Sequence, residues 1–361
     1  MTMSRSLRIA AAVALTAVVA ACSSTAATPT PAPATPAPTQ APAATPAPTT
    51  APAGKTYTMK DLVVGFIQTG SESGWRAANT SSFKETAQQQ GITLKFTDSQ
   101  NKIENQITAF NTYIQDPQVN VIVLAAVGTT GYDDVLKAAK AAGKLVVIED
   151  RRIDADSSLY YTYIGSDFDA EGQKVAKAMG DLLKAAGKTT ANIIEIGGDQ
   201  AASAAIDRHK GFGEGIQTYS DVKMTVLDYQ NAPGWDQVQG KAIMDAFLKK
   251  YPGKIDGVFG HNDELAIAGI QSAQAAGLKP GKDIQFVGVD ATADGFKSLI
   301  DGTLGADIEC NPLLAPQVFD AALKGLNGDT STVKWVPSQE SQFFAAQGAD
   351  ALKAILATRK Y

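Results

Sequence analysis

Short runs of β-branched and other apolar residues alternate with stretches of helical period from Asp61 onward. Most of these runs are unbroken, which is typical of parallel strands that are buried on both faces. A regular alternation of strand and helix predicts an α/β protein with doubly wound parallel sheets. The nine predicted strands are Leu62–Gln68, Ile92–Thr97, Val119–Ala125, Leu145–Glu149, Tyr161–Ile164, Asn192–Ile196, Val222–Leu227, Gly257–Gly260 and Ile284–Val289.

The stretch Asn101–Gln115 shows the helical period most clearly. Its apolar residues fall on one stripe, as expected for a helix that packs on a sheet; they are Ile103, Ile107, Phe110 and Ile114. Asn101 with Glu104 predicts a capping box at the start of this helix. Glycine is common just past a helix end, and such glycines are predicted at Gly91, Gly143, Gly187 and Gly277.

The first 54 residues have a different composition from the rest of the chain. Arg5 and Arg8 precede the uncharged run Ile9–Ala21, which is the layout of a secretory signal peptide. Cys22 directly follows Val-Ala-Ala, as in a bacterial lipobox, so we expect residues 1–21 to be cleaved and Cys22 to be lipidated. The alternative is an ordinary signal peptide with an incidental cysteine. The signal peptide and the lipobox together predict an extracytoplasmic protein that a lipid on Cys22 anchors to the membrane.

A tether is predicted between Cys22 and the folded part, over residues 22–56. Residues 25–54 are almost wholly Ala, Pro and Thr and include nine prolines. Proline fixes φ and lacks an amide donor, so this segment is expected to be extended and solvated.

The remaining 307 residues suit two Rossmann-like lobes better than a single core. Arg5 and Arg8 are the only charged residues before Lys55, so the folded part carries 30 basic and 37 acidic residues. This acidic balance argues against a nucleic-acid partner, because such binders cluster Lys and Arg. Two cysteines in the whole chain exclude a disulfide scaffold and a four-thiolate zinc site.

Polar and aromatic side chains follow most of the predicted strands. Ligands of doubly wound sheets bind at the carboxyl ends of the strands, so these side chains are the candidate site. They are Glu72, Ser73, Trp75 and Arg76 after the first strand, Asp150 and Arg151 after the fourth, Arg208 after the sixth, Asn262 after the eighth and Asp290 after the ninth, with Trp235 as a second flat apolar face.

This set of groups suits an uncharged, polyhydroxylated ligand. Carboxylates accept hydrogen bonds from hydroxyls, guanidinium groups donate to them, and an amide does both. The flat faces of Trp75 and Trp235 can pack on the apolar face of a sugar ring. Each residue also has a purely structural explanation, since Asp and Asn after strands often cap helices and Asp263 with Glu264 favours a helix N-terminus.

Motifs for catalysis, metals and cofactors are weak in this chain. His209 and His261 are not spaced as metal ligands, and Ala201–Ala205 is not a nucleophile elbow. Gly197-Gly198 lacks the remaining residues of a P-loop or a dinucleotide fingerprint. Cys310 is expected to be a buried, inert thiol. We therefore predict a binding protein without cofactor, metal or catalytic residues.

The folded part resembles the type I periplasmic sugar-binding proteins of ABC transporters, the ribose-binding-like group, and within it the galactofuranose-binding proteins. Ser71-Glu72-Ser73-Gly74-Trp75-Arg76 points to the galactofuranose subgroup, whereas the acid–arginine and Asn-Asp pairs are shared more widely. The segments that carry the resemblance are Val64–Phe66, Ser71–Arg76, Asn101–Gln106, Asp150–Asp154, Ala205–Phe212, His261–Asp263 and Ala276–Ile284.

The resemblance implies a hinge of three crossovers, near Gly165, Glu309 and Lys334. The N-terminal lobe would then hold residues 57–165 and 310–334, and the C-terminal lobe residues 166–309 and 335–361. A C-terminal helix around Ala345 to Ala357 is expected to pack on the second lobe.

The resemblance also assigns roles in the site. Asp150 and Arg151 would grip ring hydroxyls from the first lobe, and Arg208 would do so from the second. Trp75, Arg76 and Trp235 match positions that close on the ring, Asn262 and Asp290 match polar contacts, and Glu72 and Ser73 lie in the first loop. The chain departs from ribose binders at Ala125 and at Cys310, where they carry asparagine and glutamine, and Asn311 is expected to replace the latter contact.

The predicted function is capture of a monosaccharide, galactofuranose or a similar aldose, and its delivery to an ABC permease and its ATPase. Hinge closure around the ligand would perform this function in a monomer. One alternative is a receptor that presents bound sugar to a sensor kinase or chemoreceptor. Another is a sugar hydrolase or isomerase, which would use Glu72 with Asp150. A repressor is set aside, because a signal peptide and a tether stand where its helix-turn-helix would be.

Overall fold

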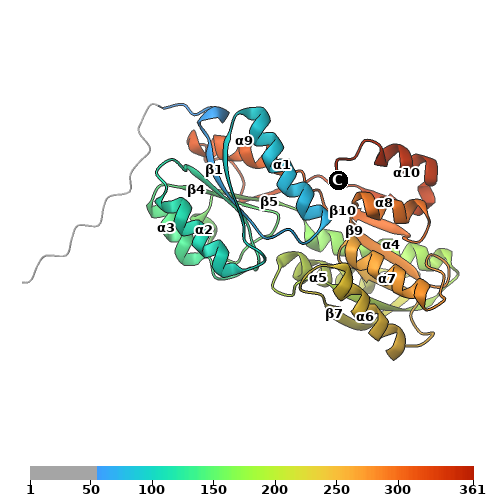
Figure 1. The fold of residues 1–361 in the computed structure, drawn as a ribbon. Coiled ribbons are helices and arrows are strands. Elements are labelled where there is room, and N and C mark those ends of the chain that lie inside the picture. The colour runs from blue at the N-terminus through green and yellow to red at the C-terminus, as the bar shows by residue number, and fades with distance from the viewer. Residues whose placement is uncertain (1–54) are drawn as a thin grey trace, which may run out of the picture. The chain divides into compact units, whose positions relative to one another are not determined.

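The computed structural model describes residues 55–361, and the predicted signal peptide, Cys22 and most of the tether lie outside the described residues. Two six-stranded sheets with helices on both faces form two lobes, as the sequence predicted (Figure 1). No helix in residues 55–361 has both the length and the apolar character needed to cross a bilayer.

The first sheet has the strand order β11-β5-β4-β3-β1-β2, and every pair in it is parallel. Its strands are β1 (Val63–Gln68), β2 (Thr93–Asp98), β3 (Val121–Ala125), β4 (Leu145–Glu149), β5 (Thr162–Gly165) and β11 (Trp335–Pro337). The strand β1 has β2 on one side and β3 on the other, so the order of the strands changes direction here. Doubly wound sheets bind ligands at such a point.

The second sheet repeats this design with the order β12-β10-β9-β8-β6-β7. Its strands are β6 (Thr190–Gly197), β7 (Lys223–Asn231), β8 (Gly257–Gly260), β9 (Gln285–Asp290), β10 (Ala306–Glu309) and β12 (Gln342–Phe344). Only the edge strand β12 runs antiparallel, along β10. All nine predicted strands are present. The strands β10, β11 and β12 were not predicted, because they are three or four residues long and carry little apolar pattern.

Helices cover both faces of each sheet and bury its apolar residues. The helices of the first lobe are α1 (Gly74–Gln90), α2 (Ile103–Gln115), α3 (Asp133–Ala141) and α9 (Ala315–Leu326). Those of the second lobe are α4 (Phe168–Ala185), α5 (Ser203–Thr218), α6 (Gln237–Lys250), α7 (Asp263–Ala275), α8 (Ala293–Ile300) and α10 (Ala349–Leu356). On one face of the first sheet Phe66 stacks on Phe83 of α1, with ring centroids 4.0 Å apart. Each lobe therefore has its own core.

The chain passes between the two sheets three times, over residues 166–167, 310–314 and 338–341. The first two passages lie where the family resemblance implied them. The third was placed too early, near Lys334. The strand β11 that follows was assigned to the second lobe, but it pairs with β5 in the first sheet. Local pattern could not show this, because a three-residue edge strand is defined only by its partner.

The predicted ends of the helices were right at their C-termini and wrong at one N-terminus. Gly91, Gly143, Gly187 and Gly277 all have positive φ and end helices, as predicted. The Asn101–Glu104 capping box does not form, because α2 starts at Ile103 and Asn101 itself has a φ of 56°. The C-terminal helix begins at Ala349, later than predicted, and its Leu352 joins the core of the second lobe.

Candidate ligand-binding site

A cavity lies between the lobes, at the carboxyl ends of both sheets. The space between its walls is about 330 Å³ when the part open to solvent is included. Every predicted site residue except Asn311 lines it. The full lining is Glu72, Ser73, Trp75, Arg76, Asp150, Arg151, Phe168, Ala204, Arg208, Trp235, Asn262, Asp290 and Cys310.

Arg76 organises the wall of the first lobe. The helix α1 starts directly after the loop that follows β1, and its N-cap Ser73 accepts a hydrogen bond from the Arg76 amide. The Arg76 guanidinium donates to Glu72 at 3.1 Å and to Asp150 at 2.7 Å, and it also donates to Gln68. Residues from the ends of β1 and β4 are thus tied together inside one lobe.

Glu72 and Arg151 complete this wall. Burial raises the pKa of Glu72, but the Arg76 and Arg151 guanidinium groups outweigh it and hold that pKa below its usual value. The Arg151 guanidinium lies 3.6 Å from Asp150 and 3.7 Å from Glu72, beyond good hydrogen-bond distance. Since Arg151 is buried and only loosely engaged, its donors are available to a ligand.

Arg208 organises the wall of the second lobe from the first turns of α5. Its guanidinium donates to Glu171 of α4 at 2.7 Å and to the carbonyl of His261 at 2.6 Å. It lies 3.8 Å from Asp290 at the end of β9. Burial raises the pKa of Glu171 to about 8, and the Arg208 guanidinium opposes this shift. Arg208 is therefore held by protein groups as well as facing the cavity.

Asn262, Asp290 and Trp235 complete the second wall. The Asn262 amide oxygen caps α7, and its nitrogen donates to the Trp235 carbonyl at 3.2 Å. Asn262 is thus both the helix cap and a cavity residue, so the structural and functional explanations hold together. Burial raises the pKa of Asp290, although the Arg208 guanidinium opposes the shift.

Three cavity residues adopt a left-handed backbone that side chains rarely tolerate. Asp150 has a φ of 60°, Trp235 of 56° and Asp290 of 121°. Such conformations cost free energy and cluster at functional sites, where they aim a side chain. Gly198 makes room for one of them, since a Cβ there would lie 2.2 Å from the Trp235 ring.

The sequence missed three residues that line the cavity, Phe168, Ala204 and Cys310. Phe168 begins α4 just after the first crossover and packs against the Arg208 guanidinium, which lies 5.1 Å from its ring centroid. Only the crossover, not the residue type, could have pointed to it. Asn311, which was also predicted for the site, is not among the residues that line the cavity. Its side chain instead accepts a hydrogen bond from the Leu313 amide, in a local turn.

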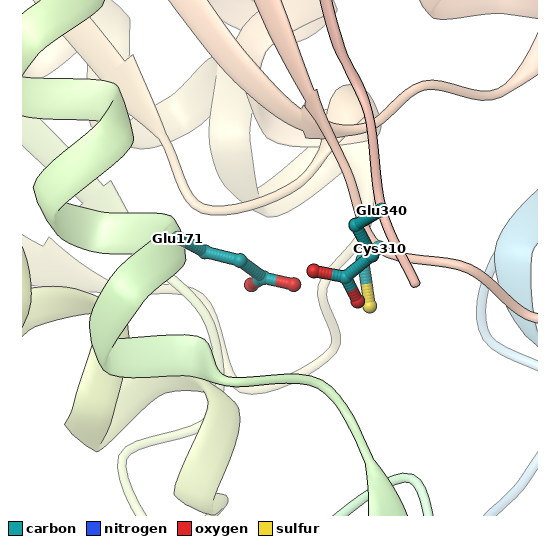
Figure 2. A group of neighbouring side chains, drawn as sticks. All are labelled: Glu171, Cys310 and Glu340. Atoms are coloured by element: carbon teal, nitrogen blue, oxygen red, sulfur yellow. The ribbon is translucent and has the colours of Figure 1, made fainter. Parts of the chain in front are cut away.

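Glu171, Cys310 and Glu340 form a group behind the cavity whose side-chain ligating atoms lie within 4.8 Å of one another (Figure 2). Glu171 comes from α4, while Cys310 and Glu340 lie in the second and third crossovers. Burial raises the pKa of all three groups. The Arg208 cation already contacts Glu171. The positive charge beside this buried group is thus supplied by the protein itself.

The cavity has a balanced set of charges and two aromatic walls. Three guanidinium groups and three carboxyl groups line it, namely Arg76, Arg151, Arg208, Glu72, Asp150 and Asp290. Trp75 and Trp235 are both about 95% buried. The Trp75 indole nitrogen donates to the Cys310 carbonyl at 2.6 Å, which fixes the ring against the second crossover. This arrangement can hold a small, neutral, polar ligand from both sides.

Comparisons with known proteins agree with this geometry. Residues 64–330 match the model of the periplasmic binding protein domain. The galactofuranose-binding protein YtfQ of Escherichia coli strain K12 is 42% identical over 267 residues, covering 73% of this chain and 81% of that protein.

Two solved structures are similar over 83% of this chain. One, from Mycobacterium smegmatis in complex with beta-D-fucofuranose, has 40% identity, a TM-score of 0.77 and 95% of its chain covered. The other is the periplasmic binding protein component of the arabinose ABC transporter from Shewanella sp. ANA-3, bound to alpha and beta-L-arabinofuranose. It has 39% identity, a TM-score of 0.75 and 99% of its chain covered. These relatives are solute-binding proteins, and with the fold, the cavity and the matched domain they place this chain in the periplasmic binding protein family.

Proposed function

We propose that this protein captures a monosaccharide, galactofuranose or a similar aldose in its furanose form, and delivers it to an ABC permease. The cavity carries the proposal, because its lining comes from both lobes and combines two tryptophans with three balanced pairs of charges. The names of the similar proteins, which bind galactofuranose, fucofuranose and arabinofuranose, support a furanose ligand.

The charge balance of the cavity favours a neutral sugar over a sugar acid or phosphate. Arg76 and Arg151 share Glu72 and Asp150, and Arg208 has Glu171 and Asp290 as neighbours. An added anion would therefore have to compete with carboxyl groups that are already present. Hydroxyl groups can accept from Arg151 and donate to the carboxylates. We therefore expect galactose and arabinose to bind and galacturonate to be rejected.

Binding without chemistry is the proposed role of the carboxylates. An enzyme would need one carboxyl to stay protonated as a general acid. Glu72 and Asp150 both form ion pairs with Arg76, and the pKa of Glu72 is lowered. Glu72 is thus poorly suited to donate a proton, and sugar incubated with the protein should be recovered unchanged.

A thermal-shift panel tests the proposed function. Ligand-free protein is heated with galactose, arabinose, ribose and galacturonate, and with a locked galactofuranoside. At about 100 times its dissociation constant, a ligand stabilises the folded state by about 2.7 kcal/mol, which raises the melting temperature by several degrees. No shift with any neutral sugar, in protein shown to be ligand-free, would contradict the proposal.

The proposed location is extracytoplasmic, with a monomer anchored through a lipid on Cys22. The signal-peptide layout and the cysteine after Val-Ala-Ala support this. The wild-type protein should incorporate labelled fatty acid and fractionate with membranes, and Cys22→Ala should abolish both. An unmodified N-terminus near Ser23 in the wild type would refute the anchor.

A further inference from the structure

Glu264 joins the two lobes at the start of α1. Its Oε1 accepts a hydrogen bond of 2.9 Å from the backbone N–H of Gly74. Gly74 is the first residue of α1 in the first lobe, and Glu264 is the second residue of α7 in the second lobe. The two residues are 190 positions apart in the chain. The first-turn acid predicted only to favour its own helix therefore also contacts the opposite lobe.

The same carboxylate is hydrogen-bonded to a residue that lines the cavity. Its Oε2 accepts a hydrogen bond of 2.9 Å from the Asn262 side-chain nitrogen. Asn262 lines the cavity and caps α7 through the Leu265 amide. One side chain thus connects a cavity residue of the second lobe with the backbone of the first.

The electrostatic setting of Glu264 favours this contact. The first amides of a helix have no partner within the helix and carry a partial positive charge. At α1 the Ser73 hydroxyl already accepts from the Arg76 amide, so the Gly74 amide is left to a group from outside the helix. Glu264 lies at the N-termini of α1 and α7 at once. Burial and the Asp263 carboxylate raise the pKa of Glu264 to about 7, and the hydrogen bond from the Gly74 amide opposes that shift.

Other contacts between the lobes differ from the one made by Glu264. Inside the cavity the Arg151 guanidinium lies 5.4 Å from the centroid of the Trp235 ring. Outside the cavity the Arg152 guanidinium makes two hydrogen bonds of 2.8 Å to Asp207 of α5. The Thr129 amide donates to the Ala201 carbonyl at 3.1 Å. The Glu264 carboxylate combines a hydrogen bond between the lobes with one to a cavity residue, Asn262.

We infer that Glu264 is a closure clasp, a positioning residue that holds the lobes together over the ligand and slows its release. The identity of the ligand in this inference rests on the proposed function, whereas the contact between the lobes does not. Because its two partners belong to different lobes, separation of the lobes must break the contact. Glu264 does not line the cavity, so its loss changes the rate of opening and leaves the choice of sugar unaltered.

A disulfide trap measures closure without any sugar. A Cβ on Gly128 of the first lobe would lie 3.5 Å from the Ala201 Cβ of the second, within the disulfide range of roughly 3.5–4.5 Å. In the Gly128→Cys, Ala201→Cys background, crosslinking under mild oxidation reports how often the lobes close. Adding Glu264→Ala should slow crosslinking about fivefold. Glu214→Ala, which removes an exposed pair with Lys210 inside the second lobe, should leave the rate unchanged.

Release kinetics provide the second measurement. The intrinsic tryptophan fluorescence, to which the cavity residues Trp75 and Trp235 contribute beside the more exposed Trp335, is followed after protein loaded with D-galactose, or with L-arabinose, is diluted into sugar-free buffer. Glu264→Ala should release sugar about tenfold faster, with an association rate within twofold of the wild type. Glu264→Gln should fall between the two, because an amide accepts from only one of the two donors, Gly74 or Asn262.

The outcomes separate the clasp from the proposed function. Equal crosslinking and equal release in the wild type and Glu264→Ala would overturn the clasp. So would a lower melting temperature of the ligand-free variant with unchanged release, since that result fits a residue that only stabilises α7. If crosslinking depends on Glu264 but no sugar of the panel binds the wild type, the clasp stands and the proposed ligand is wrong.

Discussion

The two walls of the cavity come from lobes with the same strand order, yet they hold their arginines differently. In the first lobe Arg76 donates hydrogen bonds to Glu72 and Asp150. Arg151 is no closer than 3.6 Å to either of these carboxylates. In the second lobe a single arginine, Arg208, both makes an ion pair with Glu171 and lines the cavity.

In the first wall different arginines stabilise the fold and contact the ligand, whereas in the second wall one arginine has both roles. The first wall has one arginine for structure and one that is free for a ligand. In the second wall Arg208 has both roles. Its side chain is 3% exposed and is bonded to the fully buried carboxyl group of Glu171. The corresponding substitutions should therefore have different effects on the ligand-free protein.

The largest effect is expected from Arg208→Ala. It leaves Glu171 buried with neither of its oxygens paired, and an orphaned buried polar group costs about 1–3 kcal/mol. We expect a lower melting temperature for the ligand-free protein together with sugar binding weakened at least tenfold. Lys210→Ala, which removes only exposed ion pairs, is the matched control and should change neither. An unchanged melting temperature would remove the structural half of the comparison.

Arg151→Ala should weaken sugar binding by a similar factor without affecting the fold. A hydrogen bond to a charged group contributes about 1.5–3 kcal/mol, and about 1.4 kcal/mol is one decade in affinity. The melting temperature of the ligand-free variant should stay within about one degree, because the wild-type guanidinium makes only long contacts. Calorimetric titration and a thermal melt measure the two quantities. Unfolding of this variant would show that the walls are alike.

The pH dependence of stability gives a smaller effect, carried by Glu149 at the end of β4. Burial raises the pKa of Glu149 to about 8, and the Asp150 carboxylate adds to the shift. The folded state then holds this proton more tightly than the unfolded chain. The stabilisation is fully present below the ordinary pKa of 4.5 and is lost as the pH rises through about 8.

Glu149→Gln should flatten that pH dependence. An amide can still accept from Asn79, as Glu149 does at 3.2 Å, but it cannot ionise. Urea denaturation of both proteins at pH 5, 6.5 and 8 measures the free energy of unfolding. We expect the variant to gain relative to the wild type as the pH rises. Parallel curves would show that Glu149 does not titrate in this interval.

The smallest effect is expected from Asn311→Ala. The Asn311 side chain accepts from the Leu313 amide in a turn and does not line the cavity. Its loss should change affinity less than twofold and the free energy of unfolding by about 0.5 kcal/mol or less. A tenfold loss of affinity would restore Asn311 to the site and extend the second crossover into the wall.

Most strands and the residues at their carboxyl ends could be predicted from the sequence alone. Apolar runs marked nine of the strands, and the rule that ligands bind at carboxyl ends selected the cavity side chains from Glu72 to Asp290. These signals are local, because each depends on residues that are neighbours in the chain. They predicted the class of architecture and most of the lining.

The pairing of polar groups could be learned only from the way the helices and strands pack. Arg208 and Glu171 are 37 positions apart in the chain, and Gly74 and Glu264 are 190 positions apart. Periodicity contains no information on such contacts, since they form when separate elements pack. The same reason explains the short strand β11, the role of Phe168 and the left-handed Asn101, each of which is determined by partners from distant parts of the chain.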